Sequence, residues 1–158
     1  DKARTLIRRF RDLDVAEEAL LNARKFWDET CSVIEIKTPD EAMNMLVNRW
    51  LLYQTLSCRI WARSAFYQSG GAFGLQDVMA LCHMHPHITR QQILTAAQRQ
   101  FKEGDVQHWW HPPTGRGVRT HFSDDLIWLP FVTSYYIKIT GDTSVLKEIV
   151  PFIEAPLL

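Results

Sequence analysis

The sequence predicts an all-α fold from two observations. Apolar residues recur at helical spacing along most of the 158 residues, and glycine and proline are concentrated between these periodic segments. Aromatic and charged residues gather with glycine in two of the intervening loops. About six or seven helices are therefore expected. Loop chemistry of this one-sided kind suits a helical toroid or solenoid with its site at one end.

Composition limits the partners of the chain. It is 46% hydrophobic, which is enough for the core of one domain. Its 18 Lys and Arg residues balance 18 Asp and Glu residues, so charge gives no reason to expect a nucleic acid. Cys31, Cys58 and Cys82 are odd in number and form no CxxC pair, which favours a reduced compartment. No apolar run reaches the roughly 18 residues of a membrane span, so we expect no direct membrane contact.

The first expected helix runs from Ala16 to about Glu29, where apolar side chains recur at helical spacing between charges. Residues 33–37 alternate like a short extended connector. A second helix begins after it, with Thr38 as the cap and Pro39 in the first turn. This helix is expected to continue to about residue 67. It is apolar nearly all round, which is typical of a helix buried between other helices.

Residues 69–74 predict a flexible glycine-rich loop. The helices expected after this loop are Leu75 to about Met84, Thr89 to about Lys102 with Gly104 as its stop, Ser123 to about Ile139 with Gly141 beyond its end, and a short one over Thr143 to Val150. Ser123 is the expected N-cap of the third, and Pro130 should bend that helix.

The segment from His108 to Pro130 carries most of the chemistry. Its 23 residues include three tryptophans, three histidines, two arginines and an adjacent pair of carboxylates. Aromatic faces beside acids indicate a sugar site, because a pyranose ring offers both an apolar face and hydroxyl groups. The arginines indicate an anion as well.

Asp124 and Asp125 are the most reactive candidates. Repulsion between neighbouring carboxylates favours a proton on one of them, which would make it a general acid. The alternative is that both only favour the start of the helix through its macrodipole. Adjacent residues cannot easily flank a glycosidic bond from opposite faces. One acid would suffice if inorganic phosphate were the attacking group, with Arg63, Arg116, Arg119 and the histidines as its possible ligands.

Other motifs carry less weight. The motif CHMHPH at 82–87 suggests a metal site but matches no zinc spacing. His108 and His111 with Asp105 suggest a second metal site and are rejected in the same way, so no metal is expected. Trp128 fits a helical core pattern. Gln76 and Asp77 are either polar site residues at a helix start or simply its cap.

Four segments, in this order and spacing, carry a resemblance to a known family: RWLLYQTLSCRIWARSAFYQSGGAFG, LQDVMAL, QFKEGDVQHWWHPPTGRGVRT and SDDLIWLPF. They resemble the catalytic region of cyclic β-1,2-glucan synthases, which belongs to glycoside hydrolase family 94 with the cellobiose and chitobiose phosphorylases. The resemblance runs from about Arg4 to Leu158. It implies that residues 1–158 are a single fragment of an (α/α)6 barrel.

The resemblance also implies a chemistry. Phosphate attacks the anomeric carbon with inversion, while an aspartic acid of the SDD segment protonates the leaving oxygen. We favour Asp124 as this acid, with Asp125 holding substrate or tuning the acidity of Asp124. The residues expected to contact substrate are Arg63 and Arg119, which would bind phosphate, Gln76 and Asp77, and on the acceptor side Trp109, Trp110 and His111.

No cofactor is implied beyond phosphate as a co-substrate. The implied partners are a β-glucan oligosaccharide and the remainder of a parent polypeptide. The resemblance further implies a cytoplasmic location, with the parent tethered to an inner membrane.

One departure from the family pattern stands out. Relatives of this type read GFRDQLQD after the glycine loop, whereas Gly74 here runs directly into Leu75. Four residues are missing, among them an arginine and an aspartate that would hold the donor sugar. Two hypotheses follow. The chain is either a segment of a β-1,2-glucan phosphorolysing or remodelling enzyme, inactive by itself, or a catalytically inactive helical remnant that binds glucan or serves only in assembly.

Overall fold

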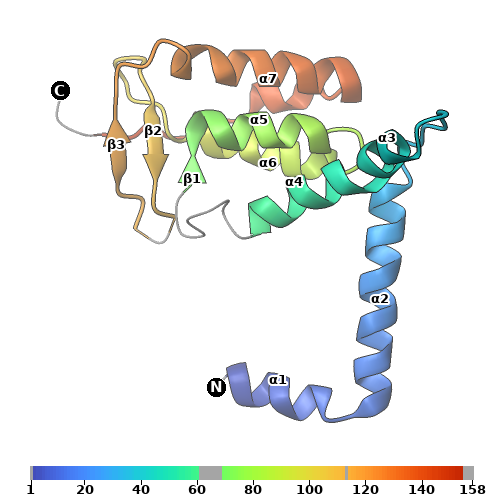
Figure 1. Cartoon of the computed structure of the whole chain (residues 1–158). Coiled ribbons are helices and arrows are strands. Elements are labelled where there is room, and N and C mark those ends of the chain that lie inside the picture. Colours follow the sequence, from blue (N-terminus) through green and yellow to red (C-terminus); the bar gives the residue numbers. More distant parts are fainter. Residues whose placement is uncertain (1, 61–68, 113, 155–158) are drawn as a thin grey trace. The chain divides into compact units, whose positions relative to one another are not determined.

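The computed structural model describes residues 2–60, 69–112 and 114–154. The chain divides into two compact units, an N-terminal unit of Asp1–Tyr53 and a C-terminal unit of Gln54–Leu158. Helices dominate the described residues of both units, which confirms the all-α prediction (Figure 1). The exception is a small three-stranded sheet. No helix in the described ranges is long and apolar enough to cross a membrane.

The helices of the N-terminal unit include the one expected from Ala16 to about Glu29 and one before it that was not predicted. They are α1 (Lys2–Phe10), α2 (Leu13–Cys31), α3 (Glu41–Met45) and a π-helical turn, η1 (Leu46–Trp50), after which α4 (Leu51–Ile60) continues across the boundary of the units. Residues 33–37 form no helix or strand, as expected for a connector.

The predicted cap at Thr38 is wrong. The N-cap of α3 is Asp40, whose carboxylate accepts hydrogen bonds from the backbone N–H groups of Ala42 at 2.9 Å and Met43 at 3.2 Å. The Thr38 hydroxyl instead bonds Asn44 Oδ1 at 2.9 Å. A carboxylate can serve two N–H donors at the positive end of the helix, which explains why Asp40 takes the capping position.

The prediction that the helix after Thr38 is buried is wrong for α3 and η1, which contain no buried residue. Met45 is 69% exposed and Trp50 is 53% exposed. A helix that is apolar all round needs neighbours on every side. In the described part of the N-terminal unit, its aromatic contacts include the ring of Tyr53 against Trp27 on α2, with centroids 4.9 Å apart.

The core of the C-terminal unit lies between three helices, α5 (Gly71–Leu81), α6 (Pro86–Ala97) and α7 (Asp125–Thr140). Figure 1 shows them side by side, with the sheet at one end. The buried side chains of this core come from all three helices and from the 3-10 helix η2 (Thr143–Lys147), and they are Leu75, Val78, Cys82, Ile93, Ala96, Val132, Tyr136 and Val145. The sheet therefore sits on the end of a conventional apolar core.

Helices α5 and α6 both deviate from their predicted bounds. Because α5 begins at Gly71 rather than Leu75, Gln76 and Asp77 lie inside the helix and not at its start. Helix α6 ends at Ala97, before the predicted Lys102. The chain then turns so that Phe101 is buried, with the Arg119 guanidinium 4.0 Å from the centre of its ring. This tertiary contact replaces the last predicted turn of the helix.

The ends of α7 show one wrong and one correct prediction. Asp124, not Ser123, occupies the N-cap position, and its side chain makes no capping hydrogen bond. At the other end Gly141 adopts the left-handed conformation, with φ of 73°, as predicted for a glycine that ends a helix. Pro130 lies inside the helix as expected.

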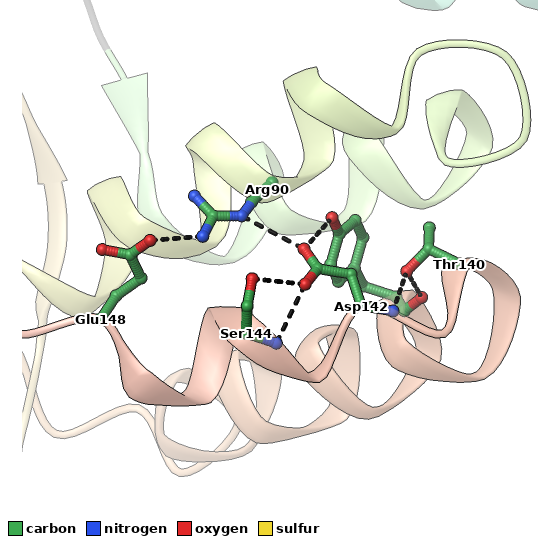
Figure 2. Close-up of polar contacts among 6 residues, drawn as sticks. Arg90, Thr140, Asp142, Ser144 and Glu148 are labelled. Carbon is green, nitrogen blue, oxygen red and sulfur yellow. Dashed lines mark hydrogen bonds and ion pairs between the residues drawn. The ribbon is translucent and has the colours of Figure 1, made fainter.

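A polar cluster fixes the C-terminal end of α7 to α6 and η2 (Figure 2). Its centre is Asp142, which accepts hydrogen bonds from Tyr136 Oη at 2.8 Å, from the Ser144 N–H at 2.9 Å and from Arg90 Nε at 3.2 Å. Arg90 also pairs with Glu148. Hydrogen bonds, foremost that from the Ser144 hydroxyl, lower the pKa of Asp142 to about 2. The cluster therefore requires Asp142 to be ionised.

Candidate active site

The segment expected to be a loop at 108–122 contains a β-hairpin. Strand β2 (Gln107–Trp110) pairs antiparallel with β1 (Ser69–Gly70) on one side and with β3 (Gly117–Arg119) on the other. Gly117 approaches β2 so closely that a Cβ atom there would lie 1.9 Å from the Trp109 carbonyl oxygen. The hairpin thus depends on glycine at this position, and the loop prediction is wrong because the strands are too short to show alternation.

A β-bulge directs one side chain of the hairpin. Gln107 pairs with Arg119 and Trp109 pairs with Val118, which leaves His108 as the extra residue of β2. Bulges of this kind re-aim side chains. Here the imidazole of His108 reaches the first turn of α7, and the ring of Phe122 lies 4.9 Å from it.

Asp125 is the residue that His108 reaches. Nδ1 of His108 lies 2.8 Å and 3.0 Å from the two carboxylate oxygens of Asp125. The Thr120 hydroxyl donates a third hydrogen bond at 3.3 Å. The side chain of Asp125 is only 2% exposed. A buried carboxylate needs such donors, because burial without them is costly.

Asp124 lies in different surroundings. It is exposed, and Trp128 Nε1 approaches its Oδ2 at 3.5 Å. Together with Ile127, Trp128 and Phe131 it lines a shallow apolar groove along α7. Trp128 also packs against the helical core, as predicted, so this tryptophan belongs to both the core and the groove.

The two neighbouring carboxylates are therefore not equivalent. Asp125 points inward to the hairpin, whereas Asp124 is open to a molecule arriving at the groove. From the sequence, Asp125 was expected to hold substrate or to tune the acidity of Asp124. Its buried, hydrogen-bonded position argues against direct contact with substrate.

Trp109, Trp110 and His111 were expected to line the acceptor side. Trp110 is only 2% exposed, and the Arg99 guanidinium lies 4.9 Å from the centre of its ring, so its position is that of a core residue. Trp109 and His111 are half-buried, and their rings meet edge to face at 5.2 Å. These two remain the better candidates for contact with a sugar.

Arg119, an expected phosphate ligand, is held by carboxylates. Its Nη2 lies 2.6 Å from Asp105 and 3.1 Å from Glu103. The hydrogen bond to Arg119 lowers the pKa of Asp105, and the same bond raises the pKa of Arg119. This arrangement favours a role for Arg119 in fixing the end of the hairpin over a role in binding phosphate.

The two polar residues of α5 differ in their surroundings. Gln76 is exposed, whereas Asp77 is half-buried and acts electrostatically on Arg59 of α4. Burial lowers the pKa of Arg59, and the charge of Asp77 opposes that shift. Arg59 also donates hydrogen bonds to the Gly74 carbonyl at 3.3 Å and to Gln92 at 3.1 Å.

The point where four residues were expected lies near Asp125. Leu75, directly after Gly74, lines the same small internal cavity as Asp125 and Gln107. Gly74 and Leu75 are consecutive residues inside α5. Four residues correspond to about one helical turn, or about 6 Å of length, and to a rotation of only about 40°. A difference of this size can therefore shorten α5 while its core-facing side stays nearly the same.

The remaining predictions concern two arginines and a metal site. Arg63 lies outside the described residues. Arg116 is exposed near the turn of the hairpin. Within the described ranges, no group of three or more His, Cys, Asp and Glu side chains could hold a metal ion. The sequence suggested His108 only as a possible phosphate or metal ligand and did not single out Thr120, because a bulge in so short a strand leaves no pattern in the sequence.

The chain is similar to known carbohydrate-active proteins. The model of the family described as "Glycosyl hydrolase 94 superfamily, catalytic domain" matches residues 26–156. A cyclic β-(1,2)-glucan synthase of Rhizobium meliloti (strain 1021) is 49% identical over 162 aligned residues, which cover all of this chain and 6% of the relative. An N,N′-diacetylchitobiose phosphorylase of Vibrio furnissii is 27% identical over 176 residues, covering 91% of this chain and 22% of the relative.

A more distant relative is a 1,2-β-oligoglucan phosphorylase of Listeria innocua, 25% identical over 126 residues, which cover 74% of this chain and 12% of the relative. The chain thus spans a small part of the length of each of these relatives. It belongs to the glycosyl hydrolase 94 superfamily, whose catalytic domains are helical barrels. The resemblance noted in the sequence is confirmed.

The alignment to the glucan synthase also bears on the glycine loop. It spans 162 positions, four more than the 158 residues of the chain. The relative therefore carries about four residues that this chain lacks, which supports the expected four-residue difference.

Proposed function

We propose that the chain is the acid-bearing segment of a domain that phosphorolyses or remodels β-1,2-glucan, with Asp124 as the general acid. The observation that carries this proposal is the contrast between the two carboxylates. Asp124 is exposed beside a groove that contains Trp128, whereas Asp125 is buried. Only an accessible carboxyl group can give its proton to a substrate.

The proposed reaction is a single displacement at the anomeric carbon. The glycosidic bond between the anomeric carbon and the leaving oxygen breaks, and its electron pair stays on that oxygen, which takes the proton of Asp124. An oxygen of inorganic phosphate forms the new bond to the anomeric carbon from the opposite face. The products are a sugar 1-phosphate of inverted configuration and a shortened glucan. No second carboxylate is needed as a base, because phosphate is already an anion.

The hairpin offers two further candidates for contact with a sugar ligand. Trp109 and His111 on the hairpin are accessible enough to contact a sugar ring. Two of the relatives are named for β-1,2-linked glucans, which supports this substrate class for the present chain. For phosphate binding we retain Arg63 and Arg116 as candidates. Arg119 is the weaker candidate because its guanidinium already faces two carboxylates.

The alternative function is that of a non-catalytic helical segment that binds glucan or serves in assembly. One observation favours it, namely the four positions at which the glucan synthase carries residues and this chain does not. If these residues held the donor sugar, their loss would remove much of the binding energy used in the transition state.

Phosphorolysis by the full-length protein that contains this chain separates the two functions. The protein is given β-1,2-glucan oligosaccharides with inorganic phosphate, and glucose 1-phosphate is measured. We expect product from the unchanged protein and a loss of at least about 100-fold in kcat for Asp124→Asn, in keeping with the usual contribution of a general acid. Glucan binding without product would favour the alternative, and full activity of Asp124→Asn would refute the assignment of the acid.

A further inference from the structure

The carboxylate of Asp125 joins two elements that are distant in the sequence. It belongs to the first turn of α7, and its hydrogen-bond partners are His108 on β2 and Thr120 just after β3. Both partners come from the hairpin, whereas the exposed carboxylate of Asp124 belongs to the residue immediately before Asp125. Whatever fixes Asp125 therefore also fixes the backbone that carries Asp124.

The hydrogen bonds have a clear direction. An ionised carboxylate only accepts, so the Thr120 hydroxyl donates to it and His108 presents its Nδ1–H. Phe122 packs against the imidazole with ring centroids 4.9 Å apart, which holds the ring in place. With the Asp125 side chain 2% exposed, water cannot readily replace either donor.

The first turn of α7 has no side-chain cap. Asp124 occupies the N-cap position without a side-chain capping bond, so the usual fixation of a helix start is absent. Two of the backbone hydrogen bonds there run from the N–H groups of Ile127 and Trp128 to the Asp124 carbonyl oxygen, at 3.0 Å and 3.3 Å. The Asp125 side chain instead ties the first turn of α7 to the hairpin.

We propose that His108 and Thr120 are positioning residues that act through Asp125 to hold the Asp124 carboxyl group in its reactive orientation. This inference rests on the proposed role of Asp124. Neither residue touches the substrate. A misplacement of about 1 Å at a reacting group can cost about 100-fold in rate, so the effect should appear in kcat more than in KM.

The test uses the full-length protein with His108→Ala, which removes the donor, and His108→Asn, whose amide can donate from nearly the position of Nδ1. Hydrogen exchange is measured at the amides of Ile127 and Trp128, and kcat and KM for phosphorolysis are measured in parallel. Thr120→Val and Thr120→Ser form a second pair that tests the weaker donor. His87→Ala, an exposed histidine of α6, is the control.

We expect His108→Ala to speed exchange at both amides about tenfold and to lower kcat about 100-fold with KM within about twofold. His108→Asn should restore both, and His87→Ala should change neither. The proposal is overturned if exchange in His108→Ala equals that of the unchanged protein, if exchange rises while kcat stays the same, or if His108→Asn behaves like His108→Ala. If His108→Ala does not fold, Thr120→Val and Thr120→Ser test the proposal by the same criteria for exchange and kcat.

Failure of the proposed function would look different. In that case the unchanged protein makes no sugar phosphate, and Asp124→Asn has nothing to abolish. The exchange measurement still decides whether His108 fixes the first turn of α7. If exchange in His108→Ala is unchanged, His108 does not fix this turn, whatever the activity of the protein.

Discussion

Asp124 and Asp125 differ in burial because of the direction in which their side chains leave the first turn of α7. Neighbouring residues of a helix are rotated by about 100° from each other. One carboxylate therefore meets the hairpin and is buried, while the other meets the groove and stays exposed. The same residue type thus serves as an anchor at one position and as a candidate acid at the next.

Gly117 offers a test of the hairpin at the residue scale. A methyl group there would lie 1.9 Å from the Trp109 carbonyl oxygen, and backbone atoms cannot move aside cheaply. We expect Gly117→Ala to lower the free energy of unfolding by about 2 kcal/mol or more, in the upper range for overpacked sites. Urea denaturation of the chain measures this.

Gly104→Ala is the comparison for that experiment. Gly104 has a φ of 99° but no atom within 4 Å of an added Cβ, so only backbone strain should appear. We expect a cost of about 1 kcal/mol there. An equal cost at both positions would contradict the close approach of the two strands.

At the scale of elements, α7 is fixed at both ends by carboxylates. Asp125 joins its start to the hairpin, and Asp142, just beyond its end, joins it to α6 and η2 (Figure 2). Between them the helix contributes Val132 and Tyr136 to the core. The orientation of α7, and with it the position of Asp124, depends on polar contacts at its ends as well as on apolar packing.

The junction around Asp142 should weaken in acid. Its pKa is about 2 in the folded chain, below the roughly 3.9 of an unfolded aspartate. The ionised group therefore stabilises the fold fully above about pH 4, and this contribution is lost as the pH falls toward 2. Hydrogen exchange of the α7 and η2 amides, followed from pH 5 to about pH 2, should show increasing opening.

Asp142→Asn should be less stable at neutral pH and should lose part of this acid dependence. Asparagine can still accept from the Ser144 N–H but cannot pair as an ion with Arg90. Glu154→Gln is the control, because its ion pair with Lys102 is exposed and lies outside this junction. An unchanged pH profile in Asp142→Asn would contradict the assignment of the acid-sensitive step to Asp142.

At the scale of the whole molecule, large apolar side chains are exposed on both units. They include Met43, Met45 and Trp50 in the N-terminal unit and Leu126 and Leu146 in the C-terminal unit. The relatives are many times longer than this chain, which spans 6% of the glucan synthase. We propose that these surfaces pack against other parts of a longer polypeptide, as the interior helices of a barrel must.

The isolated chain should therefore associate. Exposed apolar patches of this kind bind hydrophobic dyes and promote oligomers. We expect 8-anilinonaphthalene-1-sulfonate to bind and the chain to elute well above its 18.4 kDa during gel filtration. Met45→Glu together with Trp50→Glu should reduce both effects. A monomer that binds no dye would contradict the prediction.

The sequence by itself determined the helical class, the family and the segment that carries the candidate acid. Helix periodicity and the glycine that ends α7 are local properties, and the long motifs from Arg49 to Phe131 identify the family directly. Helix boundaries were less well predicted. Phe101 left the helical path because of a contact with Arg119, which lies 18 residues further along the chain.

Only the tertiary structure decided which members of the segment do what. The burial of Trp110, the pairing of Arg119 with Asp105 and the anchoring of Asp125 by His108 all join residues on different elements. A bulge in a four-residue strand and the opposite directions of two adjacent carboxylates leave no periodic pattern in the sequence. Such contacts arise from packing between elements, so residue type alone could propose the site but could not separate its exposed carboxylate from its buried one.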